Sequence, residues 1–219
     1  MSPAPAGRPA LLVLAGVNGA DKSSIAGASL REQGLDYYNP DEATRRLVDA
    51  GSTPDTANAA AWTHGRRLLQ AAIEDVTAHA FETTLGGNSI PALIRRACDT
   101  HAVTMWFVGL DTPERHIARV AQRVKRGGHD IPVERIRTRW DGARHNLIAL
   151  LPHLHELRVY DNSEEHPRAI STVAPRLLLH VRRGRIVAPG VRALNATPEW
   201  AKPIVEAARQ LPGPKLVHM

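Results

Sequence analysis

The chain has 219 residues, 43% of them apolar, which is enough for one α/β domain with a buried core. Its net charge of +6 indicates an anionic partner, and nucleotides meet that description as well as nucleic acid does. The single cysteine, Cys98, excludes an internal disulfide and fits a reducing compartment. The sequence contains no signal-peptide core and no bilayer-spanning run, so we expect a cytoplasmic protein without a membrane partner.

The predicted elements alternate along the chain. Residues 1–9 are rich in proline and are expected to be disordered. Strands are expected over residues 10–14, 35–38, 78–85, 103–110 and 157–160. Helices are expected over residues 21–33, 42–50, 57–77, 90–100, 114–126, 133–151 and 198–211. This alternation predicts an α/β fold with a parallel sheet and helices on both faces, and residues 177–187 are expected to add a β-hairpin.

The segment LLVLAGVNGADKSSI, residues 11–25, has the layout of a P-loop: a buried strand, a turn and the start of a helix. In such a loop the backbone N–H groups bind phosphate oxygens. Lys22 would reach the β- and γ-phosphates, and the Ser23 hydroxyl would bind Mg²⁺. The expected nucleotide-binding residues of the loop are Asn18, Gly19, Ala20, Asp21, Lys22, Ser23 and Ser24. The alternative interpretation is an ordinary strand–turn–helix segment.

Asp21 stands where the P-loop motif has its second glycine. Its Cβ crowds the loop, and its carboxylate adds a negative charge beside a triphosphate. At ~4 Å and an effective dielectric near 20, that charge costs on the order of a few kcal/mol. We therefore expect weakened nucleotide binding. Natural degeneration and a change introduced to silence a toxic protein both remain open as its origin.

Several segments together resemble the zeta-toxin family of P-loop kinases. They are GVNGADKSS at 16–24, NPDE at 39–42, FETTL at 81–85, RVAQRVKRGGHDIP at 119–132, Arg139-Trp140 and VYDNS at 159–163. The resemblance implies a phosphotransferase-type kinase domain with a small helical lid over residues 10–165, and a C-terminal extension over residues 166–219. It implies ATP-dependent phosphorylation of UDP-N-acetylglucosamine on the sugar 3′-hydroxyl. Many members are toxins held in check by an antitoxin, which is therefore an expected partner, while others have no evident one.

The resemblance also implies roles for the acidic residues. Asp41 would orient the sugar hydroxyl and accept its proton; the alternative is that it only caps a helix N-terminus. Glu82, with Thr83 and Thr84, would bind the substrate; the alternative for Glu82 is a partly exposed strand end. Two carboxylates beside a phosphate site imply a cation between them, so ATP (or GTP) and Mg²⁺ are the expected cofactors.

A basic helix precedes the pair Gly127-Gly128. Its arginines at 119, 123 and 126 are four and three residues apart and share one helical face. With Arg139, they resemble an arginine lid that closes over the γ-phosphate. Arg123 and Arg139 are expected to be catalytic, Arg126 to bind nucleotide, and Arg119 and His129 to contact substrate. The alternatives are a solvated basic face, which we prefer for Lys125, Arg135 and Arg137, and a helix cap for His129.

Two classes of function remain open. The first is a sugar-nucleotide kinase of zeta-toxin type, and the second is a non-catalytic relative that binds nucleotide or regulates another protein. Asp21 is the residue that distinguishes the two classes: it counts against an active kinase, whereas the other residues expected at a kinase site are present. The sequence carries no helix-turn-helix, zinc finger or aromatic stacking motif, so no nucleic-acid partner is expected. The histidines have no metal-binding spacing, and a structural zinc is not expected.

Overall fold

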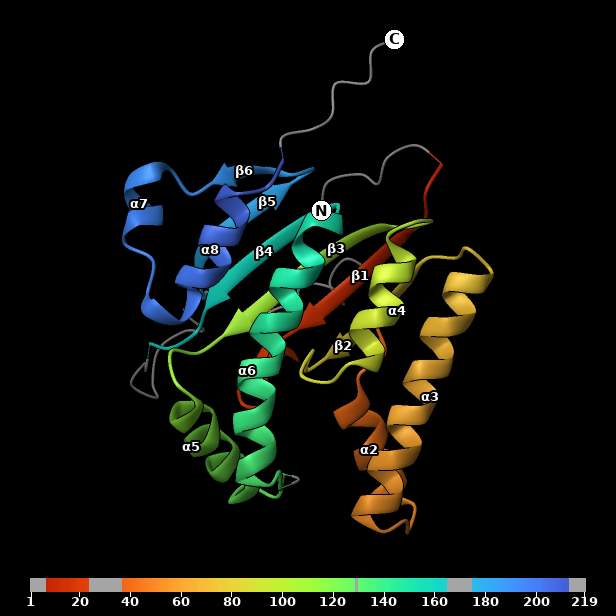
Figure 1. The fold of residues 1–219 in the computed structure, drawn as a ribbon. Helices are drawn as coiled ribbons and strands as arrows, with labels where there is room; N and C mark the ends of the chain where they lie inside the picture. The colour runs from red at the N-terminus through yellow and green to blue at the C-terminus, as the bar shows by residue number, and fades with distance from the viewer. Residues whose placement is uncertain (1–6, 24–36, 129, 165–174, 213–219) are drawn as a thin grey trace.

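The computed structural model describes residues 7–23, 37–128, 130–164 and 175–212. These residues form a six-stranded sheet in the order β2-β1-β3-β4-β5-β6 (Figure 1). The strands are β1 Ala10–Ala15, β2 His79–Thr83, β3 Ala102–Gly109, β4 Glu156–Asp161, β5 Arg176–Arg182 and β6 Arg185–Ala188. Strands β1 to β4 are parallel, and β5 and β6 continue the sheet as an antiparallel hairpin.

The described helices follow the strands in chain order. Their bounds are α2 Pro40–Asp49, α3 Pro54–Glu74, α4 Ser89–Ala97, α5 Pro113–Val124, α6 Val133–Leu150, α7 Val191–Asn195 and α8 Lys202–Arg209. None of the described helices combines the length and the apolarity needed to cross a bilayer. The helix expected over 21–33 lies outside the described residues after Ser23. Of the strand expected over 35–38, Tyr38 forms an isolated parallel bridge with Phe81.

Three helices begin at a proline, earlier than the sequence predicts. They start at Pro40, Pro54 and Pro113 rather than at 42, 57 and 114. Proline is favoured in the first turn because its φ is already helical and its missing N–H would have no partner there. In each case the residue before the proline, Asn39, Thr53 or Thr112, accepts a backbone N–H as the N-cap.

The C-terminal segment also differs in detail from the prediction. The helix expected over 198–211 is a 3-10 turn, Glu199–Ala201, followed by α8. The short helix α7 has no counterpart in the prediction. Trp200 and Ile204 are buried in the same core as the side chains of β1, so the C-terminal elements and the parallel strands share one hydrophobic core.

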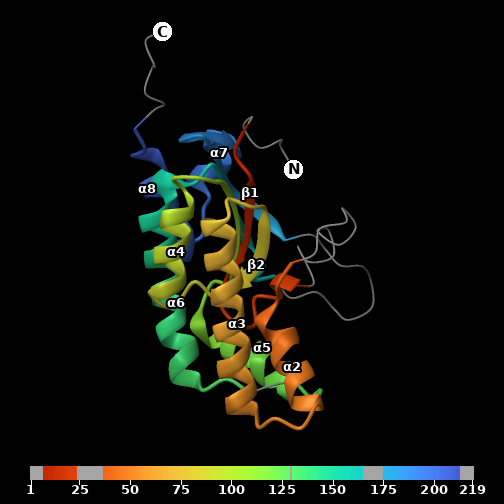
Figure 2. The same ribbon diagram turned by 90° about the vertical axis from the view of Figure 1, so that its right-hand side faces the viewer.

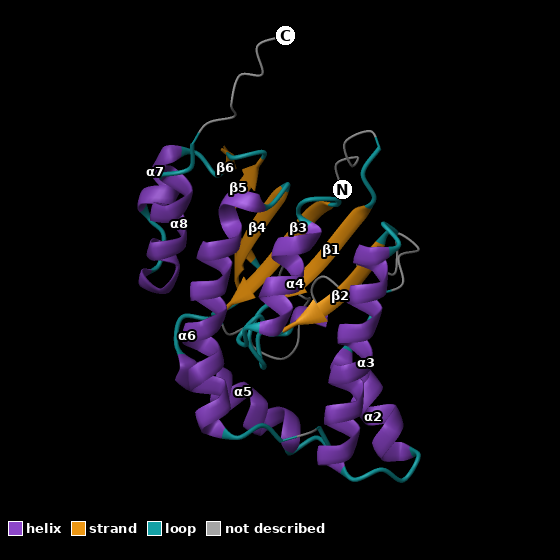
Figure 3. Ribbon diagram, turned by 45° about the vertical axis from the view of Figure 1, so that its right-hand side comes forward, coloured by secondary structure: helices purple, strands orange, loops and turns teal. Residues whose placement is uncertain are grey.

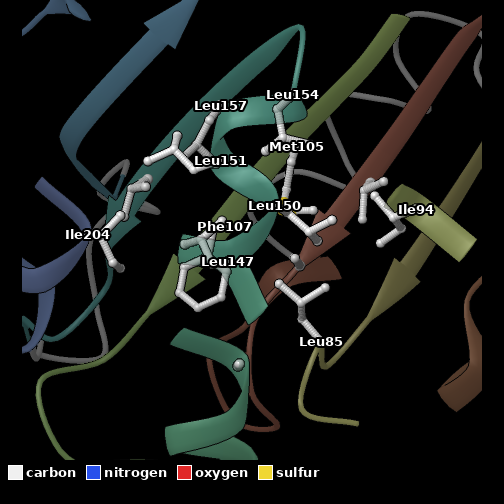
Figure 4. Packing of buried hydrophobic residues seen from close by; sticks show 14 of the residues in the cluster. Leu85, Ile94, Met105, Phe107, Leu147, Leu150, Leu151, Leu154, Leu157 and Ile204 are labelled. Carbon is white, nitrogen blue, oxygen red and sulfur yellow. The ribbon is translucent and has the colours of Figure 1, made fainter. Parts of the chain in front are cut away.

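Alternation along β1 sorts its side chains between the two faces of the sheet. Leu11 and Val13 point to a large core with α3, α4, α6 and α8, whereas Leu12 and Leu14 belong to a small cluster on the other face. Figure 2 shows α4, α6 and α8 on the same side of the sheet. The large core holds a close group of leucines from α6 and β4 around Met105 and Phe107 (Figure 4). The described helices that pack on the sheet thus cover one face, and residues 24–36 are not described.

The parallel strands β1 to β4 end at one edge of the sheet. The segments that follow them are the P-loop after β1, residues 84–88 after β2, Leu110-Asp111 after β3 and Asn162-Ser163 after β4. Helices α2 and α5 lie beyond this edge (Figure 3). In α/β sheets the carboxyl edge is where ligands bind, so the topology brings the predicted site residues together.

Candidate active site

Gly19 and Asp21 of the P-loop have a left-handed backbone conformation. Gly19 has φ 84° and Asp21 has φ 59°. A Cβ on Gly19 would lie 2.8 Å from the carbonyl oxygen of His116, so α5 approaches the loop at backbone distance. Asp21 occupies a region that glycine enters without strain and that aspartate tolerates better than most residues. The loop therefore keeps a glycine-like backbone at position 21 despite the substitution.

Glu82 binds both functional side chains of the P-loop. Its Oε1 lies 3.3 Å from Lys22 Nζ, and both side chains are buried, at 7% and 6% exposure. Ser23 Oγ donates to the other carboxylate oxygen, Oε2, at 2.7 Å. Glu82 is thus a buried partner of the P-loop and not a partly exposed strand end, because β2 pairs directly with β1.

The Asp21 carboxylate turns towards α5. Its Oδ2 lies 3.2 Å from Arg119 Nη1, and Arg119 Nη2 donates to the carbonyl of Asn162 at 2.7 Å. Asn162 Nδ2 in turn donates to the carbonyl of Ala20 at 3.1 Å. Asp21 is therefore paired with a cation, and Arg119 braces the P-loop.

Asp41 is not the cap of α2. The side-chain Oδ1 of Asn39 accepts the backbone N–H groups of Asp41 and Glu42, at 2.9 and 3.3 Å. The Asp41 carboxylate instead lies 3.3 Å from Arg123 Nη1 and is 48% exposed. The capping interpretation of Asp41 is therefore wrong, and its carboxylate faces the space between α2 and α5.

Arg139 reaches the P-loop from α6. Its Nη1 donates to Asn18 Oδ1 at 2.8 Å. Burial lowers the pKa of the Arg139 guanidinium, the positive charge of Arg135 lowers it further, and the Asp41 carboxylate opposes both effects. These shifts indicate a partly desolvated cation that would gain from an anionic ligand.

Two adjoining cavities meet at this edge of the sheet. The smaller, of about 430 Å³, is lined by the P-loop and by Arg119, Arg123 and Arg126. The larger, of about 720 Å³, extends between α3 and α6 and is lined by Thr83, Thr84 and Arg139 among others. Both cavities are lined by Asn18, Lys22, Asp41 and Glu82. Of the predicted site residues, Ser24 and His129 lie outside the described residues.

Oxygen donors suited to Mg²⁺ are present at the P-loop. Ser23 Oγ and a Glu82 carboxylate oxygen lie 2.7 Å apart, and Asn39 Nδ2 donates to the same hydroxyl at 3.2 Å. Among the described residues no group of three or more His, Cys, Asp or Glu could hold a metal ion. Magnesium is typically held by one or two protein oxygens together with phosphate and water, so this donor set fits it.

Two positioning contacts were not predicted from the sequence. His116 Nδ1 lies 2.8 Å from the carbonyl oxygen of Asn18 and is buried at 1% exposure. Asn146 Nδ2 donates to two carbonyls in the segment after β2. Neither residue belongs to a motif, and each acts on a segment distant in sequence. Asn39 and Asn162, by contrast, lie inside the recognised segments NPDE and VYDNS.

His116 leads to a prediction about pH. Burial is the largest cause that lowers its pKa, from 6.5 to about 4, so the folded protein keeps it neutral. Between these two values the unfolded chain binds a proton that the folded chain does not, so stability falls as pH falls. From pH 7 to pH 5, the loss attributable to His116 is about 2 kcal/mol.

His116→Asn is expected to remove this share of the pH dependence, and its Nδ2 can still donate to the carbonyl of Asn18 from the position of His116 Nδ1. The measurement is urea unfolding of the parent and the variant at both pH values, and the difference between the two proteins separates His116 from the other histidines. Parallel losses of stability in parent and variant would contradict the assignment.

Comparisons with known proteins agree with this architecture. No family model matches the sequence, and no curated protein matches it. A chain of the crystal structure of the AvrRxo1-ORF1:-ORF2 complex with ATP is similar, with a TM-score of 0.64 and 16% identity over 98% of this chain and 66% of that one. A chain of the native complex gives a TM-score of 0.64 and 16% identity, over 94% and 72%. The chain thus spans about two thirds of the AvrRxo1 chains it matches.

A chain of the PezAT chromosomal toxin–antitoxin system of Streptococcus pneumoniae gives a TM-score of 0.48 and 13% identity, over 74% of this chain and 71% of that one. The AvrRxo1 similarity, at its low identity, concerns the fold. It confirms the predicted α/β fold class with a mostly parallel sheet flanked by helices.

Proposed function

We propose that this chain is a P-loop phosphotransferase that moves the γ-phosphoryl group of ATP or GTP to a hydroxyl of a sugar nucleotide. The observation that carries the proposal is the junction of the two cavities, which Lys22, Asp41, Asn18 and Glu82 line from both sides. A phosphate donor in the smaller cavity and an acceptor in the larger one would meet there. The AvrRxo1 complex, whose fold is similar, was crystallised with ATP.

The acceptor proposed is UDP-N-acetylglucosamine, phosphorylated on its 3′-hydroxyl. This choice rests on the resemblance of the FETTL and RVAQRVKRGGHDIP segments to the zeta-toxin family. The same resemblance supports an antitoxin as a partner, and the AvrRxo1 chains were crystallised as an ORF1:ORF2 complex.

The residues divide the work of in-line phosphoryl transfer. Backbone N–H groups of the P-loop bind the phosphate oxygens, and Lys22 exchanges its Glu82 partner for the β- and γ-phosphates. The acceptor hydroxyl oxygen bonds to the γ-phosphorus while the bond from that phosphorus to the β–γ bridging oxygen breaks, and the nucleoside diphosphate leaves. Asp41 takes the hydroxyl proton. Mg²⁺, held by Ser23 and Glu82, would supply charge neutralisation on the phosphates.

The arginines neutralise the charge that spreads over the transferred group. Arg123 and Arg139 approach the junction from α5 and α6. Arg123 forms an ion pair with Asp41, and the charge of the Asp41 carboxylate acts to raise the pKa of Arg139. Arginine suits this task because its planar fork binds two oxygens at once and stays charged. Arg119 has a different place, since it is paired with Asp21. We therefore propose Arg119 as a brace of the P-loop, and Arg123 and Arg139 as the arginines that contact phosphate.

A second candidate function is a non-catalytic nucleotide-binding or regulatory protein. Asp21 favours it, because a carboxylate at this position opposes a bound triphosphate. Both candidates predict binding of nucleotide in the smaller cavity, and they differ in turnover.

The test is phosphoryl transfer from Mg·ATP to UDP-N-acetylglucosamine, with the product detected by mass. The parent chain and Asp21→Gly are run side by side, and Lys22→Ala is the negative control. A phosphorylated sugar nucleotide from the chain or from Asp21→Gly supports the kinase. Nucleotide binding without any transfer, by either protein and with GTP as well, would favour the regulatory function.

A further inference from the structure

Helix α6 presents one face to the turn that follows β2. Arg139, Gly142 and Asn146 are three and four residues apart, so they lie on the same side of the helix. Each of them contacts the turn at residues 85–87, which we call the β2 turn. The β2 turn also lines the larger cavity, through Leu85, Gly86 and Gly87.

Glycines let the helix and the turn meet at backbone distance. A Cβ on Gly86 would lie 2.6 Å from Arg139 Cγ and 2.8 Å from its Cα. A Cβ on Gly142 would lie 2.6 Å from the carbonyl oxygen of Gly86. Separations this short leave no room for a methyl group on either residue. The β2 turn is therefore seated directly on the helix turn that carries Arg139.

Asn146 fastens the two segments together. Its amide nitrogen has two N–H groups, and it donates to the carbonyls of Leu85 and Gly87 at 2.7 and 2.9 Å. These two carbonyls flank Gly86. Leu85 itself has φ 58°, an uncommon conformation for a leucine, and its N–H donates to Thr83 Oγ1 at 3.0 Å. The Asn146 amide thus holds the turn on both sides of Gly86.

The same helix face ends at the P-loop. Arg139 Nη1 donates to Asn18 Oδ1 at 2.8 Å, and Asn18 lines both cavities. The guanidinium, the β2 turn and the wall of the larger cavity are therefore connected through one stretch of α6. A change in how the β2 turn sits on the helix would move the guanidinium relative to the acceptor.

We propose that Asn146 is a positioning residue: by clamping the β2 turn onto α6, it fixes the Arg139 guanidinium relative to the acceptor wall of the larger cavity. This inference rests on the proposed phosphotransferase function for its kinetic consequence. A displacement of about 1 Å at such a contact costs up to about a hundredfold in rate. Nothing in the arrangement requires Asn146 to touch nucleotide or acceptor.

The experiment compares Asn146→Ala with His145→Ala, a matched control at the next residue of α6, whose side chain is exposed. Transfer to UDP-N-acetylglucosamine and hydrolysis of ATP are measured in the same reaction. Asn146→Ala is expected to lower the ratio of transfer to hydrolysis about tenfold or more and to leave the KM for ATP unchanged. A merely structural role would lower the amount of folded enzyme and leave this ratio unchanged, which would overturn the proposal.

A second variant, Gly142→Ala, tests the proposal if Asn146→Ala does not fold. Gly142→Ala keeps both Asn146 hydrogen bonds possible but places a methyl group against the Gly86 carbonyl, so it is expected to lower the same ratio. His145→Ala is expected to match the parent. An unchanged ratio in Gly142→Ala contradicts the proposal even if Asn146→Ala cannot be purified.

A spectroscopic measurement separates this proposal from the proposed function. The Arg139 Nε–Hε signal of protein labelled with ¹⁵N-arginine is assigned by its loss in Arg139→Lys. It is expected to shift or broaden in Asn146→Ala and Gly142→Ala, and to stay in place in His145→Ala. If neither the parent nor Asp21→Gly transfers phosphate, the proposed function fails and this signal decides alone: movement supports the clamp, and an unmoved signal overturns it.

Discussion

Asp41→Asn is expected to lower phosphoryl transfer at least a hundredfold while Mg·ATP still binds. Asp41 lines both cavities and carries a carboxylate 3.3 Å from Arg123, and the proposed function makes this carboxylate the acceptor of the hydroxyl proton. General-base catalysis of this kind contributes roughly 10²–10⁴ in rate. Asparagine keeps the shape of the side chain and loses its basicity. The measurement is the rate of transfer to UDP-N-acetylglucosamine, with ATP affinity by calorimetry.

The matched control is Asp49→Asn, which removes an exposed carboxylate from the other end of the same helix. It is expected to leave both transfer and ATP affinity at the parent values. If the activity of the parent chain is too low to measure, both variants are made in Asp21→Gly. Transfer by Asp41→Asn at a near-parent rate would limit Asp41 to holding Arg123, since Asn39 already caps α2.

The local sequence pattern predicted the P-loop and the order of strands and helices in the parallel part of the sheet. A strand followed by Gly16 and Lys22-Ser23 indicated the P-loop, and the parallel β1 to β4 carry its partners to one edge. The predicted helix starts lie after Pro40, Pro54 and Pro113, where the helices in fact begin, because proline both breaks a preceding segment and is favoured as the first residue of a helix. These are errors of boundary that leave the topology unchanged.

The contacts that organise the site could not be predicted in the same way. The partner of Asp21 is Arg119, which follows it by 98 residues, and the choice depends on how α5 docks on the loop at Gly19. Arg119, Arg123 and Arg126 all line the smaller cavity, but α5 ends at Val124, so Arg126 lies beyond the helix on which their spacing places it. The spacing also gives no sign that Arg119 braces the P-loop while Arg123 pairs with Asp41. The partners of side chains at the sheet edge depend on how distant segments pack together. The spacing of residues within one helix therefore cannot predict them.

Asp21→Gly is expected to strengthen Mg·ATP binding about tenfold, which is ~1.4 kcal/mol. The change removes a carboxylate from the phosphate cavity and leaves Arg119 as an uncompensated cation beside it. The gain is smaller than an isolated charge would give, because the carboxylate is half exposed and already paired. The variant also relieves a left-handed aspartate at φ 59°, worth about 1 kcal/mol of stability. Calorimetric titration with Mg·ATP and urea unfolding measure the two effects.

Arg119→Ala, which breaks the ion pair between Arg119 and Asp21, is a sharper test of the electrostatic effect of Asp21 on nucleotide binding. This variant leaves the Asp21 carboxylate unpaired beside the phosphates, so its affinity for Mg·ATP is expected to fall below that of the parent. The double variant carries neither charge and is expected to return close to the parent. The predicted order of affinity is therefore Asp21→Gly, then parent and double variant, then Arg119→Ala.

Asp111→Ala is the control for this series, because it also removes a carboxylate paired with an arginine of α5, Arg115, but one that lines neither cavity. It is expected to leave Mg·ATP affinity unchanged. Equal affinities of the parent and Asp21→Gly would mean that Arg119 already cancels the carboxylate in full. In that case Asp21 would be a tolerated, compensated residue of the loop, and the electrostatic case for an inactivated kinase would fail.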